Sequence, residues 1–193
     1  AQAIISRQPI DLVAFTGSLK TAKMIHQSLS LKAGKIIPLI AETGGLNAMV
    51  VDSSALLERA CDDIIRSAFN SAGQRCSALR LLLVHEAIYP QLISMLKGAM
   101  NDLTIGAPLD LNVDVGPIIN IQSLNKLQNY LDKMKANGHA IFQTSKKSIL
   151  QDQCLLLPTL IELELSSMPD EEQFGPILHV VSFSEETLVD SLK

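Results

Sequence analysis

Cysteine is scarce in this chain, and its spacing excludes two kinds of architecture. The 193 residues contain three cysteines, an odd number with no Cys-x-x-Cys pair. This pattern argues against a disulfide framework and against a structural zinc site, so we expect no bound metal. Unpaired thiols fit a reducing intracellular compartment, and we expect a cytoplasmic protein.

Runs of like charge and long apolar runs are also missing. The formal net charge is −4, and no block of like charges forms the electrostatic footprint of a nucleic-acid or anionic-lipid surface. No apolar run approaches the roughly 18 to 20 residues that span a bilayer, and the amino terminus has no signal-peptide layout. We therefore expect no transmembrane segment and no contact with nucleic acid.

Both ends of the chain look cut. Residues 1–9 begin without an initiator methionine or a helix cap, and the sequence stops inside the helical pattern of residues 185–193. Hydrophobic residues make up 47% of the chain, which is ordinary for a globular protein with a substantial core. We interpret the sequence as a globular piece of a longer protein.

Alternating strand and helix patterns predict an α/β fold. Apolar runs of strand length, typical of a parallel sheet, alternate with segments in which apolar residues recur at the helical period. The predicted strands are residues 11–15, 35–41, 47–51, 80–85, 140–143, 155–162 and 177–183. The predicted helices are residues 19–31, a helix that starts at 52–54 and runs into the turn at Gly73, then 87–103, 122–137 and 185–193. We expect Gly34 to close the first of these helices.

The stretch Gly73-Gln74-Arg75-Cys76-Ser77 places one cysteine on a turn that a glycine opens. Arg75 adds a permanent positive charge beside the thiol, which favours a reactive thiolate. The alternative is a buried cysteine that packs as a small apolar residue, and Cys61 and Cys154 fit that description better. Because its neighbours are polar, Cys76 is the candidate nucleophile.

Glu42 ends an apolar run and is followed by the pair Gly44-Gly45. A carboxylate at the end of an apolar strand is partly desolvated, which raises its pKa and suits a general base. The alternative is a solvent-facing carboxylate that caps a turn. Together with Cys76, Glu42 suggests covalent catalysis through a thioester.

Two further motifs lie at element boundaries. Residues Phe15 to Ser18 form a strand-to-helix turn, whose amides and serine hydroxyl can hold a pyrophosphate. The full G-x-G-x-x-G fingerprint is missing, so an ordinary capped helix is the alternative. Residues Glu171 to Pro176 place two acids and an aromatic before a Gly-Pro break, and the alternative there is a polar loop.

In this order, the motifs resemble the NAD(P)-dependent aldehyde dehydrogenase superfamily over nearly the whole chain. The resemblance is carried by FTGS (15–18), AETGGLNAMVV (41–51), FNSAGQRCSA (69–78), DVGP (114–117) and EEQFGP (171–176). GQRCSALR, DSSAL and PTLIEL further resemble the L-glutamate γ-semialdehyde (Δ1-pyrroline-5-carboxylate) dehydrogenase branch, as found in the bacterial bifunctional proline-utilisation protein. The resemblance implies the end of a Rossmann-type NAD-binding domain, residues 1–44. A three-layer α/β/α catalytic domain with a mainly parallel sheet would follow over residues 45–193, truncated at its carboxyl terminus.

The resemblance also implies roles for the catalytic motifs. Cys76 would attack the aldehyde to form a thiohemiacetal and, after hydride transfer, a thioester. Glu42 would activate the water that hydrolyses this thioester, and the backbone amide of Cys76 would supply half of an oxyanion hole. Arg75 and Ser77 would contact the substrate carboxylate, a role that suits a cation and a hydroxyl.

The cofactor roles follow in the same way. Gly17 and Ser18 match the pyrophosphate-binding turn, Glu172 matches the acid that binds the nicotinamide ribose, and Phe174 matches the aromatic beside it. Ala22 stands where many members carry a second glycine. The segments that complete the oxyanion hole and grip the adenosine ribose are absent, so we expect the piece alone to be inactive or nearly so. Losing one oxyanion donor typically costs about two to three orders of magnitude in rate.

The implied reaction is the NAD-dependent oxidation of L-glutamate γ-semialdehyde to L-glutamate, the second step of proline degradation. The implied partners are the aldehyde, the rest of the polypeptide and other copies in a homo-oligomer. FAD is expected only if the parent carries a proline dehydrogenase domain, and such a parent can be peripheral to the inner membrane. Three alternatives stay open: another aldehyde substrate, a cofactor-free thiol hydrolase, and a non-catalytic α/β piece. The hydrolase is disfavoured because no histidine has an obvious pairing with Cys76.

Overall fold

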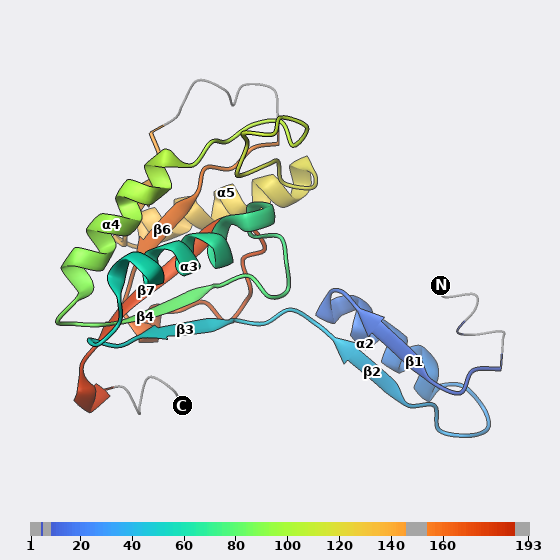
Figure 1. Ribbon diagram of the computed structural model, residues 1–193. Coiled ribbons are helices and arrows are strands. Elements are labelled where there is room, and N and C mark those ends of the chain that lie inside the picture. The colour runs from blue at the N-terminus through green and yellow to red at the C-terminus, as the bar shows by residue number, and fades with distance from the viewer. Residues whose placement is uncertain (1–4, 6–8, 146–153, 188–193) are drawn as a thin grey trace. The chain divides into compact units, whose positions relative to one another are not determined.

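The computed structural model describes residues 5, 9–145 and 154–187 (Figure 1). The chain forms two compact units, Ala1–Gly45 and Leu46–Lys193. The expected helix over residues 185–193 lies mostly outside the described residues, as does most of the segment 1–9.

The first unit is a strand, a helix and a second strand. Strand β1 (Val13–Thr16) pairs in parallel with β2 (Leu39–Glu42), and α2 (Leu19–Ser30) connects them. Ser18 begins the helix, because its side chain accepts a hydrogen bond from the Thr21 amide. In the parallel register Thr16 lies beside Glu42, so the turn after β1 and the end of β2 share one edge of this small sheet.

The end of α2 differs from the prediction. The helix stops at Ser30, and Leu31 is its C-cap with its amide bonded to the Gln27 carbonyl. Gly34 has a φ of 104° but lies three residues beyond the cap. The expectation that Gly34 closes this helix is therefore wrong, since the local backbone already satisfies the last carbonyls before the glycine is reached.

The second unit is built on a five-stranded sheet with the order β3-β4-β7-β6-β5. The strands are β3 (Ala48–Val51), β4 (Leu81–His85), β5 (Ala140–Gln143), β6 (Thr159–Glu162) and β7 (Ile177–Phe183). All neighbouring pairs are parallel except β5 with β6. The prediction of a mainly parallel sheet is confirmed.

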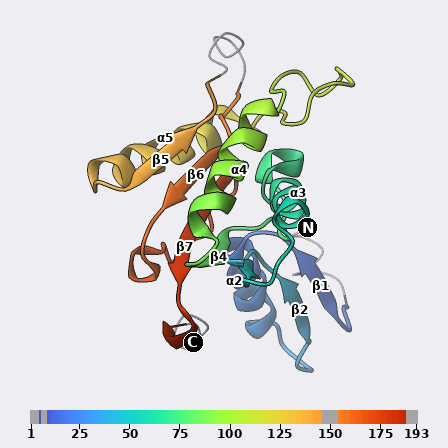
Figure 2. The ribbon, with the colours of Figure 1, turned by 60° about the vertical axis from the view of Figure 1, so that its left-hand side comes forward.

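Helices cover both faces of this sheet, as Figures 1 and 2 show. They are α3 (Leu57–Phe69), α4 (Tyr89–Asp102) and α5 (Ile121–Ala136), and α3 and α4 pack on each other on the face opposite α5. All five residues of β4 are buried, which explains its continuous apolar run. The α/β fold with three layers is thus confirmed.

A hydrogen-bonded chain joins α5 to the centre of the sheet. Burial raises the pKa of Tyr130 to about 12, so its hydroxyl stays protonated and donates to His179 Nε2 at 2.6 Å. The Nδ1 atom of His179 then donates to the Arg80 carbonyl at 3.0 Å. Burial also lowers the pKa of His179 to about 4, with a smaller opposing effect from that carbonyl, so the ring is neutral at pH 7.

The start of α3 also differs from the prediction. Asp52 does not cap a helix, because its carboxylate accepts hydrogen bonds from the Ser54 amide and hydroxyl and forms a local turn. The helix begins at Leu57, and its N-cap Leu56 offers no side-chain bond. The expected start at residues 52–54 is therefore too early.

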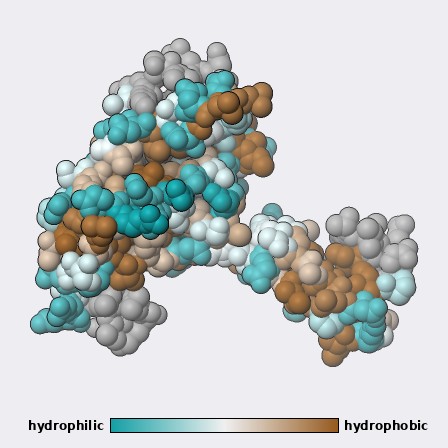
Figure 3. All heavy atoms as spheres, in the orientation of Figure 1, coloured by the Kyte–Doolittle hydropathy of each residue, from teal (hydrophilic) through white to brown (hydrophobic). Residues whose placement is uncertain are grey.

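Exposed apolar side chains gather on the segment between α4 and α5 and at the start of α5 (Figure 3). They are Leu109, Leu111, Ile119 and Ile121. None of the helices in the described ranges combines the length and apolarity that a membrane crossing requires.

Candidate active site

The candidate nucleophile lies just after a strained turn, between α3 and β4. A 3-10 turn, Asn70–Gly73, follows α3, and Ser71, Ala72 and Gly73 take left-handed φ angles of 55°, 53° and 63°. Non-glycine residues rarely adopt this conformation, and such strain gathers at functional sites. Cys76 follows on the loop and is exposed to solvent.

The other two cysteines have different surroundings. Cys61 is buried in α3, and desolvation, with a smaller effect of the Asp62 charge, raises the pKa of its thiol. Cys154 is half-buried. A raised pKa keeps a thiol in its unreactive form, so Cys61 suits the role of a packed core residue.

Two side-chain amides fix the loop that carries Cys76. The Asn47 amide donates to the carbonyls of Cys76 and Ala78 at 2.7 and 2.9 Å. The Gln74 amide donates to the Pro117 carbonyl at 3.0 Å, and its oxygen accepts from the Ile119 amide at 2.9 Å. The Gln74 contacts bring two sequence motifs together, GQRCS and DVGP. Sequence reasoning assigned no role to either amide.

The Cys76 loop also packs closely on the loop of residues 171–176. A Cβ atom placed on Gly73 would lie 2.2 Å from the Gly175 carbonyl oxygen. Such an approach requires glycine, because a methyl group there would overlap the backbone of the other loop. The structure therefore brings the motifs around Cys76 and Glu172 into contact.

Arg80 connects these two loops by hydrogen bonds. Its guanidinium is fully buried, and its Nε and Nη2 atoms donate to Glu172 Oε1 at 3.1 and 2.8 Å. The Nη1 atom donates to the Gly175 carbonyl, and Nη2 also donates to the Arg75 carbonyl. The Phe174 ring centroid lies 5.4 Å from the Arg80 Cζ atom. Sequence reasoning missed this residue, although a charge at the start of a buried apolar strand is a usable signal.

A hollow of about 300 Å³ lies beside the Cys76 loop. It is lined by Asp63, Arg66, Ser67, Asn70, Arg75, Ser77 and Ala78. The two residues predicted to contact a carboxylate, Arg75 and Ser77, thus share one hollow. Arg66 adds a second guanidinium that sequence reasoning did not identify. The Asp63 carboxylate also lines the hollow, but it pairs with Arg59 at 3.6 Å. The guanidinium groups and the hydroxyl are donors that match a carboxylate.

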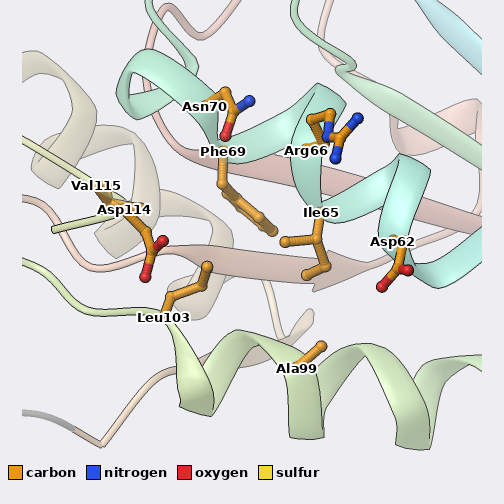
Figure 4. Close-up of a pocket in the computed structure, with 9 residues that line it drawn as sticks. All are labelled: Asp62, Ile65, Arg66, Phe69, Asn70, Ala99, Leu103, Asp114 and Val115. Atoms are coloured by element: carbon orange, nitrogen blue, oxygen red, sulfur yellow. The ribbon is translucent and has the colours of Figure 1, made fainter. Parts of the chain in front are cut away.

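A second hollow of about 340 Å³ lies between α3 and α4 (Figure 4). Phe69 and Ile65 form its apolar floor, and Asp114 closes one end. The Asp114 carboxylate already accepts a hydrogen bond from the Thr104 amide at 2.8 Å. Arg66 lines both hollows, so the surface of α3 separates them.

The remaining predicted site residues lie in the first unit. The Gly17 amide donates to the Glu42 carbonyl at 3.1 Å, so the predicted pyrophosphate turn and the predicted base are neighbours. The Ser18 side chain caps α2, and the Glu42 side chain is exposed. Because Glu42 and Cys76 belong to different units, their approach across one cleft stays a prediction.

Within the described ranges, no three His, Cys, Asp or Glu side chains come together in a way that could hold a metal ion.

The chain matches the aldehyde dehydrogenase family over residues 1–189, and it belongs to that family. Bifunctional protein PutA of Salmonella typhimurium is 40% identical over 189 residues, which are 94% of this chain and 14% of that protein. PutA of Rhizobium meliloti is 41% identical over 180 residues, 91% of this chain and 15% of that protein. The chain thus spans about a seventh of the length of these curated relatives.

Solved structures agree with this assignment. A mutant of proline utilization A (PutA) from Bradyrhizobium japonicum superposes with a TM-score of 0.91 at 42% identity, over 98% of this chain and 19% of that one. Betaine aldehyde dehydrogenase from Staphylococcus aureus, in complex with NAD+, gives a TM-score of 0.87 at 28% identity, over 96% of this chain and 37% of that one. The resemblance predicted from the motifs, including that to the proline-utilisation proteins, is confirmed.

Proposed function

We propose that this chain supplies the thiol nucleophile of an aldehyde dehydrogenase within a larger PutA-like protein. The proposed reaction is the NAD-dependent oxidation of L-glutamate γ-semialdehyde to L-glutamate. One observation supports it above the others: an exposed Cys76 on a loop that Asn47, Gln74 and Arg80 fix by hydrogen bonds. A nucleophile held in one geometry spends less entropy in reaching the transition state.

In this proposal the Cys76 thiolate attacks the aldehyde carbon, and a carbon–sulfur bond forms as the carbonyl oxygen becomes negatively charged. Among the described residues, the Cys76 amide has no hydrogen-bond acceptor, so it is free to donate to this oxygen. NAD, when bound, would supply the acceptor for the hydride that leaves the thiohemiacetal carbon. Glu42 then takes a proton from water, which attacks the thioester and releases the carboxylic acid and the Cys76 thiolate.

The residues assigned to the cofactor suit a dinucleotide in their chemistry. Glu172 uses Oε1 for Arg80, and its Oε2 atom accepts no hydrogen bond from the described residues, so it can accept one from a ribose hydroxyl. The ring of Phe174 is 44% exposed and offers an apolar face nearby. In the first unit, the amino terminus of α2 follows Gly17 and presents backbone amides to a phosphate.

The substrate assignment rests on the hollow beside Cys76. Arg75 and Ser77 flank the nucleophile and line this hollow, which supports an aldehyde that carries a carboxylate. A simple aliphatic aldehyde offers these donors no acceptor, so only a carboxylated substrate gains binding energy from them.

The nucleophile is tested by Cys76→Ala in the full-length protein, with Cys154→Ala as the matched control. We expect NADH formation from L-glutamate γ-semialdehyde to disappear in the first variant and to stay near the wild-type rate in the second. A Cys76→Ala variant that still makes NADH at a near-normal rate would refute the proposal.

The substrate class is tested by Arg75→Ala. We expect KM to rise for L-glutamate γ-semialdehyde and to change little for an aliphatic aldehyde of the same length, because only the first carries a carboxylate. An equal rise for both aldehydes would count against a carboxylate contact and would favour the alternative of another aldehyde substrate.

A further inference from the structure

Hydrogen bonds of its own backbone hold Arg80 in place, in addition to those of its side chain. The Arg80 amide donates to the Asn47 carbonyl at 3.0 Å, just before β3. Its carbonyl accepts from both the amide and the Nδ1 atom of His179 on β7, each at 3.0 Å. The guanidinium therefore extends from a fixed backbone position just before β4, where the Cys76 loop and the loop of residues 171–176 meet.

The guanidinium then binds three acceptors that belong to both loops. On the loop of residues 171–176 it binds Glu172 Oε1 and the Gly175 carbonyl, and on the Cys76 loop it binds the Arg75 carbonyl. A planar group with donors on three sides can reach such acceptors at once, whereas a lysine ammonium is a single point of charge. The Glu172 carboxylate is consequently fixed in rotation, with Oε2 left for a ligand.

Stability alone does not explain a charge at this position. Arg80 is 0% exposed and the Glu172 side chain 15%, and a buried ion pair is often no more stabilising than apolar side chains of the same volume. The next four residues along β4, Leu81 to Val84, are apolar and buried. The presence of an arginine here, where an apolar residue would pack as well, is therefore best explained by its orientation of the Glu172 carboxylate.

We propose that Arg80 is a positioning residue for cofactor binding. Its guanidinium holds the Glu172 carboxylate against the Cys76 loop, in the orientation in which Oε2 accepts a ribose hydroxyl of the dinucleotide. This inference rests on the proposed function, which assigns Glu172 to the cofactor.

The test is a double-mutant cycle in the full-length protein, with the dissociation constant for NAD measured by isothermal titration calorimetry. We expect Arg80→Lys and Glu172→Gln each to raise this constant by about tenfold, the effect of one lost charge-assisted hydrogen bond. The double variant should bind NAD no more weakly than Glu172→Gln alone, because in this proposal the effect of Arg80 on NAD passes through Glu172. Fully additive effects would overturn the proposal.

Lys97→Gln is the matched control. It removes another partly buried ion pair of the same unit, Lys97 Nζ with Glu162 Oε1 at 2.7 Å, away from both loops. We expect its affinity for NAD to equal that of the wild type. An effect as large as that of Arg80→Lys would show a general response to lost ion pairs and would contradict a positioning role.

Steady-state kinetics give a second measurement. Arg80→Lys should raise KM for NAD more than KM for the aldehyde, because Glu172 loses its partner whereas the Cys76 loop keeps its hydrogen bonds to Asn47 and Gln74. If Arg80→Lys does not fold, Arg80→Gln takes its place, and failure of both variants to fold would overturn the inference, since Arg80 would then serve the fold alone. Wild-type protein that binds no NAD would refute the proposed function, whereas wild-type affinity in Arg80→Lys would refute only this inference.

Discussion

Replacing Gly73 by alanine tests whether the two loops of the candidate site depend on their close packing. Gly73 has a left-handed φ of 63°, and an added Cβ would lie 2.2 Å from the oxygen and 2.6 Å from the carbon of the Gly175 carbonyl. These are backbone atoms, so no side-chain rotation relieves the overlap. One of the two loops has to move.

The expected loss of stability has two parts. A non-glycine residue in the left-handed region costs about 1 to 2 kcal/mol. The overlap adds about 1 to 3 kcal/mol, the usual range for overpacking. Gly138→Ala isolates the first part, because Gly138 has a φ of 84° and nothing within 4 Å of the added Cβ. Gly73→Ala should therefore lose about 2 to 5 kcal/mol, and Gly138→Ala only the smaller amount.

Urea unfolding followed by far-ultraviolet circular dichroism is the suitable assay, since the chain contains no tryptophan. The free energy of unfolding should fall clearly further for Gly73→Ala than for Gly138→Ala. If the two variants differ by less than about 0.5 kcal/mol, the usual size of a neutral surface change, the contact between Gly73 and Gly175 does not hold the loops together.

Three further predictions concern the groups around the site. Burial lowers the pKa of His179 from 6.5 to about 4, so below pH 6.5 the unfolded chain binds a proton that the folded chain does not. The free energy of unfolding should then fall by about 2 kcal/mol between pH 7 and pH 5, and a slope that persists unchanged in His179→Gln would contradict this cause. Tyr130→Phe leaves the buried Nε2 atom of His179 without a donor and should cost about 1 to 3 kcal/mol in thermal unfolding. Tyr89→Phe removes a hydrogen bond to Glu162, but Glu162 still accepts one from Lys97, so this variant should lose less stability. Equal losses in the two variants would argue against the hydrogen bond from Tyr130 to His179. Asn47→Ala frees the carbonyls of Cys76 and Ala78 and should lower kcat of the full-length protein by about tenfold to a hundredfold, and an unchanged kcat would show that the loop holds its shape without Asn47.

Local sequence patterns predicted the interior of most elements and missed some of their ends. Strands β5 and β7 have the predicted bounds, because their apolar runs are bounded by turns on both sides. The predicted start of α3 was too early because the Asp52 carboxylate forms a turn with Ser54 and does not cap the helix. Apolar periodicity does not show which of these two roles an aspartate takes. The strand expected from residue 155 begins only at Thr159, after Pro158 removes a backbone donor.

The sequence by itself determined the family, the alternation of strands and helices, and the placement of Cys76 on a turn opened by glycine. These depend on residues that are neighbours along the chain, where periodicity and turn chemistry act. Only the tertiary structure decided that Arg80 binds Glu172, 92 residues away, and that Gln74 binds Pro117. The parallel pairing of β4 with β7 brings their preceding loops to one edge of the sheet, and no local pattern specifies which strands become neighbours.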